Sequence, residues 1–160
     1  MCNLRRIKSG FVEYDLLEQA LAECQISKGW IVRQDLSAGE AYNVLWTNVP
    51  LAFLVDTGTC KFGVDYEGNV LFSERGAGIG VGASRAADVG RAQVELAEVY
   101  DQLLWRAGGA TDIVVTQIEN GVEIDAEILP KLNLENKYIQ SALQRALSGP
   151  AEVEHMKESV

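Results

Sequence analysis

Apolar side chains recur at helical spacing in two long stretches of the chain. In residues 15–24 the pattern begins with Asp15 and Glu18, whose spacing predicts a capping box at the start of a helix. In residues 89–104 the apolar face continues until Gly108-Gly109, which predicts the end of a longer helix. These two segments are the expected main helices of the protein.

A third stretch, residues 134–147, also has a helical apolar face, and Gly149-Pro150 predicts its end. We expect this helix to cover its own sheet, and docking on a partner is the alternative. Residues 150–160 are polar and predict a disordered tail. No linker divides the remainder, so residues 1–149 are expected to form a single domain.

Between these helices the pattern changes to β-branched and aromatic side chains separated by turn signals, which predicts strands. A first strand is expected in residues 4–12, and a hairpin is expected around Asn120-Gly121, because this pair favours a tight turn. The links are too short for the crossovers of a parallel sheet, so the strands are expected to be antiparallel. The central runs are Trp30–Val32, Tyr42–Trp46, Leu51–Val55, Cys60–Tyr66 and Val70–Phe72.

The order of the elements predicts the fold class. A strand, a helix, several strands, a helix, a hairpin and a final helix follow one another along the chain, which is typical of an α+β fold. We therefore expect an antiparallel sheet with the two main helices packed on one face, plus a C-terminal helix.

The balance of charges argues against two classes of binding partner, nucleic acids and anionic membranes. The chain has 160 residues, with 14 Lys and Arg against 23 Asp and Glu, and a formal net charge of -9. This charge opposes binding to nucleic acid or to an anionic membrane, and the one basic cluster, Arg5, Arg6 and Lys8, is short. No apolar run suits a signal peptide or a membrane span, so a cytoplasmic location is expected.

Three cysteines, Cys2, Cys24 and Cys60, are far apart in the sequence and do not have the paired spacing of a zinc site. We interpret them as reduced thiols. If the initiator Met is removed, Cys2 becomes a terminal thiol beside a free amine and is a candidate catalytic nucleophile. An incidental terminal cysteine is the favoured alternative, since no oxyanion hole can be located.

A glycine-rich stretch in residues 73–86 is the main candidate for ligand binding. It falls between a predicted strand and a predicted helix, where backbone amides can hold a phosphate. The loop lacks a lysine and the preceding sheet is expected to be antiparallel, so a flexible surface loop is the favoured alternative. The candidate residues for an anion or nucleotide are Gly76, Gly78, Gly80, Gly82 and Ser84.

Other polar and aromatic residues are weaker candidates. Glu123, Asp125 and Glu127 alternate along a predicted strand, which favours a solvated face over a cation site. The one histidine, His155, falls in the predicted tail and cannot form a triad or a metal site alone. We expect no metal and no cofactor. The tryptophans Trp30, Trp46 and Trp105 are expected in the core rather than around a pocket.

Several local sequences resemble those of a known family: Ile7-Lys8, Leu16-Leu17, Ala20-Leu21, Gly29-Trp30, Phe62 to Tyr66, Tyr100 and Asn120-Gly121. Over roughly residues 4–128 the chain resembles a small family of plastid and cyanobacterial hypothetical open-reading-frame proteins of unknown function. Members of that family close with an aromatic-ended strand, where this chain has Ile128-Leu129-Pro130. The resemblance implies a small accessory protein and assigns no catalytic residue.

The sequence leaves three hypotheses about function, and the third is the least favoured. The favoured one is a non-enzymatic accessory or protein-interaction module whose partner is another protein, because no catalytic residue types converge in the sequence. The alternative is a small-molecule or anion binder that uses the glycine-rich stretch. An enzyme that uses Cys2 is the third, and the sequence leaves a homo-oligomer open.

Overall fold

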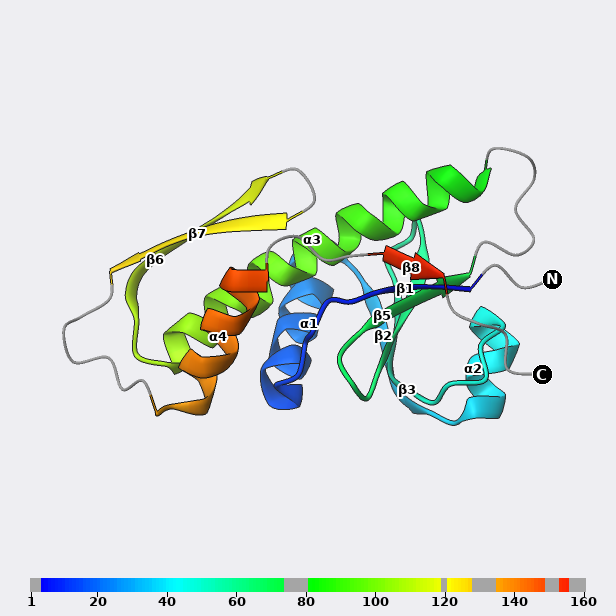
Figure 1. Ribbon diagram of the computed structural model, residues 1–160. Coiled ribbons are helices and arrows are strands. Elements are labelled where there is room, and N and C mark those ends of the chain that lie inside the picture. Colours follow the sequence, from blue (N-terminus) through cyan, green and yellow to red (C-terminus); the bar gives the residue numbers. More distant parts are fainter. Residues whose placement is uncertain (1–3, 74–80, 119–120, 128–134, 149–152, 156–160) are drawn as a thin grey trace.

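The computed structural model describes residues 4–73, 81–118, 121–127, 135–148 and 153–155, and these residues form an α+β fold, as predicted (Figure 1). The elements in chain order are β1 (Leu4–Ile7), α1 (Tyr14–Lys28), β2 (Ile31–Leu36), α2 (Ala38–Leu45), β3 (Leu51–Asp56), β4 (Lys61–Asp65), β5 (Val70–Ser73), α3 (Val81–Ala107), β6 (Thr111–Ile118), β7 (Gly121–Glu127), α4 (Lys137–Ser148) and β8 (Val153–His155).

The strands form two separate sheets. The main sheet has the order β2-β3-β4-β5-β1-β8, and each neighbouring pair is antiparallel, which confirms the predicted strand direction. Strands β6 and β7 pair with each other alone, in a register that places Ile118 opposite Gly121 and so confirms the predicted hairpin. The hairpin lies along α3, apart from the main sheet (Figure 1).

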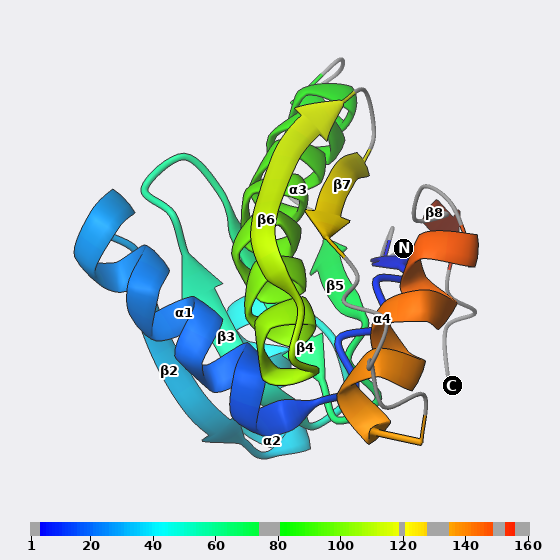
Figure 2. The ribbon, with the colours of Figure 1, turned by 90° about the vertical axis from the view of Figure 1, so that its left-hand side faces the viewer.

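Helices α1 and α3 cover one face of the main sheet, as predicted, and they contact each other there (Figure 2). The large side chains between them and the sheet are at most 1% exposed, so each contributes roughly 2–3 kcal/mol of transfer free energy to folding. These side chains are Leu17, Phe53, Phe62, Phe72, Leu96 and Tyr100.

Helix α2 covers the opposite face, in a segment where a strand was predicted. The prediction of a strand at residues 42–46 is wrong, because Ser37 and Glu40 form a capping box: each side chain accepts a hydrogen bond of 3.2 Å from the other residue's backbone N–H. Ala41 and Leu45 are one turn apart and buried against the sheet. The aromatic residues of this run therefore belong to a helix.

The approach of α2 to the sheet depends on a glycine in β4. A Cβ atom at Gly63 would lie 2.7 Å from both terminal methyl groups of Leu51 and 2.9 Å from Cδ1 of Leu45. Close packing leaves no space for such an atom. Gly63 thus allows α2 to lie directly on the sheet.

The starts of both main helices differ from the predictions. Helix α1 begins at Tyr14 after Glu13, whose side chain makes no capping hydrogen bond, so the capping box predicted from Asp15 is wrong. Asp15 instead lies in the first turn, where its negative charge favours the positive end of the helix dipole. Helix α3 begins at Val81 and therefore includes part of the stretch predicted as a loop.

The end of the chain is more ordered than predicted. Helix α4 packs against α3 rather than on the sheet, with Ile139 fully buried beside Gly108. Residues 153–155 form β8, which pairs with β1 and places His155 opposite Arg5. The prediction of a disordered tail is wrong for these three residues. Among the described residues, no helix is both long and apolar enough to cross a membrane.

Candidate functional site

A pocket of about 430 Å³ lies at one end of the main sheet. Four parts of the fold meet there: the end of α2, the turn between β3 and β4, the last residues of β5, and the second turn of α3. Its volume is within the range of small-molecule sites. The lining residues are Val44, Leu45, Trp46, Asp56, Gly58, Thr59, Cys60, Lys61, Phe72, Ser73, Arg85 and Val89.

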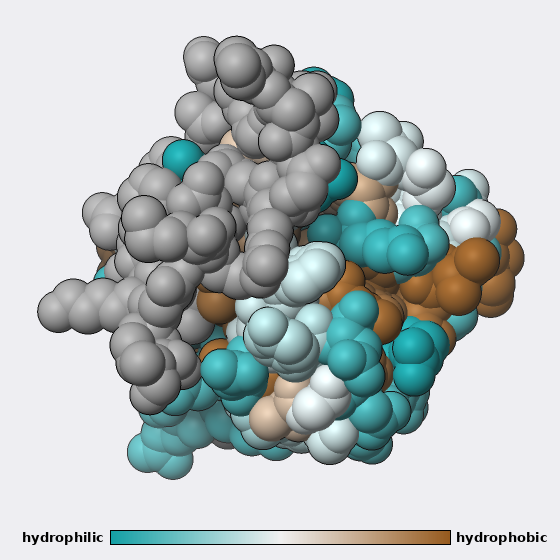
Figure 3. All heavy atoms as spheres, turned by 90° about the vertical axis from the view of Figure 1, so that its right-hand side faces the viewer, coloured by the Kyte–Doolittle hydropathy of each residue, from teal (hydrophilic) through white to brown (hydrophobic). Residues whose placement is uncertain are grey.

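The surface at this end of the molecule is mixed in character. Figure 3 views the protein from this side and shows brown apolar surface between teal hydrophilic side chains. Val44 and Leu45 come from α2, and Phe72 and Val89 come from the core between the sheet and α3. Leu45, Phe72 and Val89 are buried, so the accessible surface of the pocket is mainly polar.

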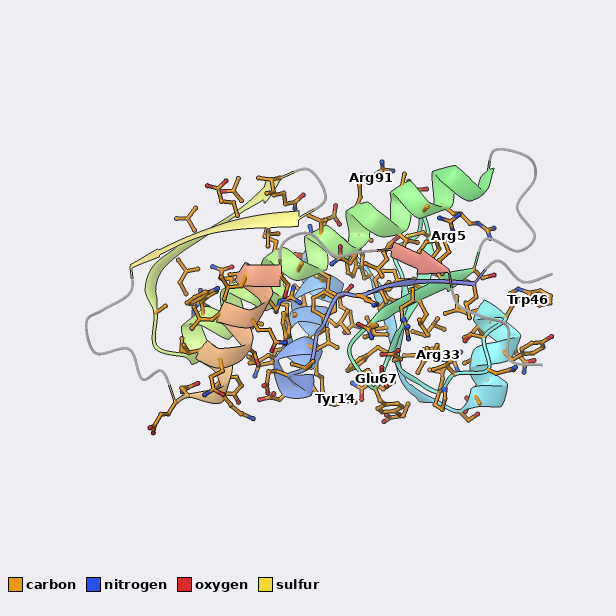
Figure 4. All side chains as sticks on the ribbon, viewed as in Figure 1. Arg5, Tyr14, Arg33, Trp46, Glu67 and Arg91 are labelled. Atoms are coloured by element: carbon orange, nitrogen blue, oxygen red, sulfur yellow. The ribbon has the colours of Figure 1, made fainter. Side chains whose placement is uncertain are left out.

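Trp46 ends α2 in an unusual backbone conformation. Its φ is 62° and its ψ is 27°, the left-handed region, and its N–H donates to the carbonyl of Tyr42 at 2.9 Å. Glycine or asparagine usually occupies this position after a helix. The Trp46 side chain is 42% exposed and extends outward from the end of α2 (Figure 4). An indole ring is thereby held at the pocket with much of its surface uncovered.

The turn between β3 and β4 is fixed by its own side chains. Asp56 Oδ1 accepts a hydrogen bond from the Gly58 N–H at 2.9 Å, and Thr57 Oγ1 accepts one from the Cys60 N–H at 3.1 Å. Asp56 is therefore engaged within the turn. Lys61, which follows the turn, is exposed.

Arg85 brings a second cation to the pocket. Its Nη1 donates to the carbonyl of Ser73 at 3.4 Å, which links α3 to the end of β5. The lining residues thus include two cations, Lys61 and Arg85, and one anion, Asp56, which lies directly opposite Lys61 in the pairing of β3 with β4. A second anion, Asp88 on α3, is close enough for its charge to add to burial in raising the pKa of the Cys60 thiol, so the described residues do not give the pocket a net positive charge.

The two cysteines in the described part of the chain are not activated. Burial raises the pKa of the Cys60 thiol, and the hydrogen bond from Thr57 only partly opposes this shift. Burial likewise raises the pKa of Cys24 to about 11. Both residues are therefore thiols rather than thiolates at neutral pH, and the thiolate is the nucleophilic form. The third candidate, Cys2, lies outside the described residues.

No family model, curated protein or solved structure matches this chain. The resemblance to the plastid and cyanobacterial family therefore stays a prediction. The fold and the pocket are therefore the features that bear on the function of this protein.

The structure describes only part of the predicted ligand site. Gly76, Gly78 and Gly80 lie outside the described residues, whereas Gly82 and Ser84 are in the first turns of α3. The prediction of a loop is wrong for residues 81–86, which are helical. In the sequence, the glycine-rich stretch connects two residues that line the pocket, Ser73 and Arg85.

Among the other predicted candidates that the structure describes, Trp46 lines the pocket, whereas Trp30, Trp105 and Glu123 do not. Trp30 and Trp105 are buried, 5% exposed each, as predicted, and the prediction is wrong for Trp46. Glu123 is exposed on β7, away from the main sheet. In the part of the chain that the structure describes, no group of three His, Cys, Asp or Glu side chains could hold a metal ion. Reasoning from the sequence missed Lys61 and Arg85, although Arg85 directly follows the glycine-rich stretch.

A second group of polar residues joins α4 to α3 and to the segment before α1; we call it the arginine cluster, and it contains Ser9, Phe11, Tyr100, Asp101 and Arg145. Arg145 binds Asp101 through two hydrogen bonds, Nε to Oδ1 at 2.5 Å and Nη2 to Oδ2 at 3.2 Å, and also donates to the Ser9 carbonyl. Its guanidinium lies 4.8 Å from the centre of the Phe11 ring and 5.0 Å from that of Tyr100. These contacts satisfy the guanidinium within the protein, so the cluster is structural.

Proposed function

We propose that this protein is a non-enzymatic binding protein that holds a small molecule in the pocket between α2, the β3–β4 turn, β5 and α3. The observation that carries the proposal is the position of Trp46. A large aromatic side chain stands at the pocket, partly exposed, on a backbone conformation that disfavours it.

The backbone conformation of Trp46 has an energetic cost. A residue other than glycine in the left-handed region is less stable by about 1–2 kcal/mol. Trp46 is nevertheless 42% exposed, and one of its contacts is with the ring of Tyr42, which is 43% exposed. Strained backbone that local packing does not explain is common at ligand sites. A ligand that covers the indole ring would account for this arrangement.

The chemistry of the pocket favours binding over covalent catalysis. Thr59, Cys60, Lys61 and Ser73 are the lining residues of nucleophilic types, and the side-chain hydrogen bond of Cys60 is with the hydroxyl of Thr57 rather than with a base. Asp56 accepts a backbone hydrogen bond within its own turn. These contacts give the pocket shape, charge and an aromatic surface, which are the requirements for recognition.

A thermal-shift screen tests this proposal. Wild-type protein would be heated with a panel of neutral, cationic and anionic metabolites, since a ligand that binds the folded state stabilises it by about 2.7 kcal/mol at a hundred times its Kd. We expect at least one compound to raise the Tm of the wild type and to lose this effect with Trp46→Gly. The control is Tyr66→Ala, which removes an exposed aromatic ring outside the pocket.

Two results would contradict the proposal. A panel that leaves the Tm of the wild type unchanged would argue against a ligand in this pocket. A compound that stabilises Trp46→Gly as strongly as the wild type would show that it binds elsewhere. Either result would favour the second candidate function over the first.

The second candidate function is an accessory role in which this protein docks on another protein. Two exposed tyrosines support it. Tyr66 is 59% exposed and donates its hydroxyl to Asp35 at 2.7 Å. Tyr14 is 39% exposed, and desolvation, followed by the charge of the same Asp35 carboxylate, raises its pKa. Tyrosine is enriched in protein interfaces because its ring is large and its hydroxyl is polar.

Affinity capture from the native host tests this second role. The bait proteins are the wild type, Tyr66→Ala and Trp46→Gly. We expect a reproducible partner that Tyr66→Ala loses and Trp46→Gly retains. A partner retained by both variants, or no reproducible partner, would argue against docking through these tyrosines.

A further inference from the structure

We infer that this protein forms a two-fold symmetric dimer through β6, whose outer edge pairs in antiparallel orientation with β6 of a second copy. This interface goes beyond the proposed function, because the hairpin that carries it does not line the pocket. Three features of the described residues support the dimer: the edges of the two sheets, the side chains on β6 and the charges on the neighbouring strand.

The two outer strands of the main sheet are protected against pairing with another chain. Strand β8 has only three residues. Strand β2 carries the charged residues Arg33 and Asp35, and the backbone of Asp35 is in the left-handed region, with a φ of 54°, rather than extended. Short edge strands, charged side chains and local distortions are the features by which proteins prevent pairing at a sheet edge.

The β6–β7 hairpin has one protected strand and one unprotected strand. Strand β7 has an acidic residue at every second position, Glu123, Asp125 and Glu127. Strand β6 has eight residues, and residues 113–118 include no charged residue and no proline, while five of these six are β-branched. An exposed strand of this composition pairs readily with a strand of another chain.

The outer edge of β6 is open in the part of the chain that the structure describes. There β6 pairs with β7 alone, and β7 lies on one side of it, over α3 (Figure 2). Because the N–H and C=O groups of successive residues point to alternate sides of an antiparallel strand, half of those in β6 point away from β7. A two-stranded hairpin is marginally stable by itself, and a further strand would satisfy these groups.

The exposed apolar side chains of β6 lie on one face of the hairpin. Ile113 packs against the core, and the side chain of Gln117 donates a hydrogen bond to Glu98 of α3, so alternate residues from 113 to 117 face α3. Val114 and Ile118 therefore lie on the opposite face, where they are 58% and 47% exposed. An uncharged edge with exposed apolar side chains beside it is a surface that association would cover.

A second copy of the chain is the occupant that the charges favour. Because residues 113–118 are uncharged, antiparallel pairing of this segment with its own copy places no like charges opposite each other. The same pairing through β7 would place carboxylates opposite carboxylates, since the acidic residues occur at every second position. A two-fold axis also makes every contact of the β6 pair occur twice.

The exposed side chains favour one register of the β6 pair. With Thr116 opposite its own copy, Val114 lies opposite Ile118 of the second copy on both sides of the axis. Apolar pairs and Thr–Thr pairs across neighbouring strands are favourable. Stable interfaces bury about 1,200–2,000 Å² in total, and two strands of this length bury less, so we expect a reversible dimer that forms at micromolar concentrations.

Sedimentation velocity at increasing protein concentration tests the inference. We expect the wild type to change from monomer to dimer as its concentration rises to about 500 µM. Ile118→Lys should raise the Kd of the dimer by about tenfold or more, because it places a charge opposite Val114 of the second copy. The matched control is Ile31→Lys, the same change at a 65% exposed position of β2, which should leave the Kd unchanged.

Thr116→Lys provides a second variant if Ile118→Lys fails to fold. Within one copy, the new ammonium group lies opposite Glu123 of β7, which favours the hairpin. Between copies, two ammonium groups lie opposite each other. The Kd of the dimer should therefore rise by about tenfold or more, while the Tm at low concentration stays level or rises.

Cysteine crosslinking tests the register. In a background with Cys2→Ser and Cys60→Ser, oxidised glutathione should link two copies of Thr116→Cys, because opposite residues of antiparallel strands have Cα atoms about 4.5–5.5 Å apart, within the range of a disulfide. Val114→Cys is the control. In this register it lies four residues from its own copy along the strand, roughly 13 Å away, and should not be linked.

Three results would overturn the inference: a wild type that stays monomeric at about 500 µM, a Kd that Ile31→Lys raises as much as Ile118→Lys does, or crosslinking of Val114→Cys as fast as that of Thr116→Cys. Ligand binding in the pocket is measured separately by the thermal-shift screen. Failure of the dimer therefore leaves the proposed function unchanged, and a screen without a ligand leaves the dimer unchanged.

Discussion

The pocket and the arginine cluster both bring an arginine from a helix to aromatic and carboxylate side chains, but they use it differently. Arg145 is 16% exposed, and its guanidinium is held by Asp101, the Ser9 carbonyl and two aromatic rings. Arg85 borders an open volume of about 430 Å³ that also contains the partly exposed Trp46. Arg85 also has protein partners, among them the Ser73 carbonyl, so the two arginines differ in the open volume beside them rather than in whether they are paired.

The largest expected effect is on the arginine cluster. Arg145→Ala leaves the Asp101 carboxylate, 4% exposed, without its charged partner, so we expect the free energy of unfolding to fall by about 3–5 kcal/mol. Chemical denaturation measures this loss. The matched control is Lys137→Ala, which removes a 66% exposed partner of Glu13 on the same helix and should change stability little. Equal losses of unfolding free energy in Arg145→Ala and Lys137→Ala would contradict a structural role for the arginine cluster.

A smaller effect is expected where α2 meets the sheet. Gly63→Ala forces a methyl group against Leu51 and Leu45, and overpacking of this kind costs roughly 1–3 kcal/mol. The same change should weaken the binding of any ligand that contacts Trp46, because Trp46 lies at the end of α2. Gly39→Ala is the control, since its new Cβ meets no atom within 4 Å and alanine favours the helix, so the Tm should stay level or rise.

Trp46→Gly should change stability least while affecting binding most. Glycine relieves the left-handed strain of about 1–2 kcal/mol, and this gain opposes the loss of the partly buried indole contacts. We therefore expect a free energy of unfolding within about 1 kcal/mol of the wild type. Denaturation and ligand titration of the same preparation check this. A loss as large as that of Arg145→Ala would mean that Trp46 is structural.

Thiol labelling compares the core, which contains Cys24, with the pocket, which contains Cys60, and needs no variant that changes the packing of either region. In a Cys2→Ser background, iodoacetamide should modify the half-buried Cys60 of the pocket well before the buried Cys24, which reacts only after local opening. Because burial raises the pKa of both thiols, the labelling rates should still increase as the pH rises above 9.0, the ordinary value. Mass spectrometry of the tryptic peptides measures both rates. Faster labelling of Cys24 would contradict the described packing.

The periodic parts of the sequence predicted the fold well. Helix α3 and the β6–β7 hairpin follow from local signals, an apolar face at helical spacing and an Asn-Gly pair, which act over a few residues. Helix α2 was missed because its aromatic and β-branched residues favour strands, while the capping box of Ser37 and Glu40 decides the outcome. Strand β8 was missed because its pairing with β1 depends on residues far apart in the sequence.

The site was harder to predict than the fold. The glycine-rich stretch indicated the right neighbourhood, since Arg85 directly follows it, but Lys61 comes from a turn that only the folded sheet brings close. Trp46 gave no signal, because the left-handed position after a helix is usually marked by glycine or asparagine. Its exposure results from the tertiary structure, and a tryptophan in an apolar run is more often buried.

The pairing of β8 with β1 has a consequence for how the protein is made. Arg5 lies opposite His155, so the two strands that close this edge come from the first and the last parts of the described chain. On the ribosome, β1 can pair with β5 once residue 73 has emerged, but its other edge stays open until residue 155 has emerged. During that interval the unpaired edge of β1 can bind a strand from a neighbouring nascent chain, and β8 then covers it and leaves a strand of only three residues as the outer edge.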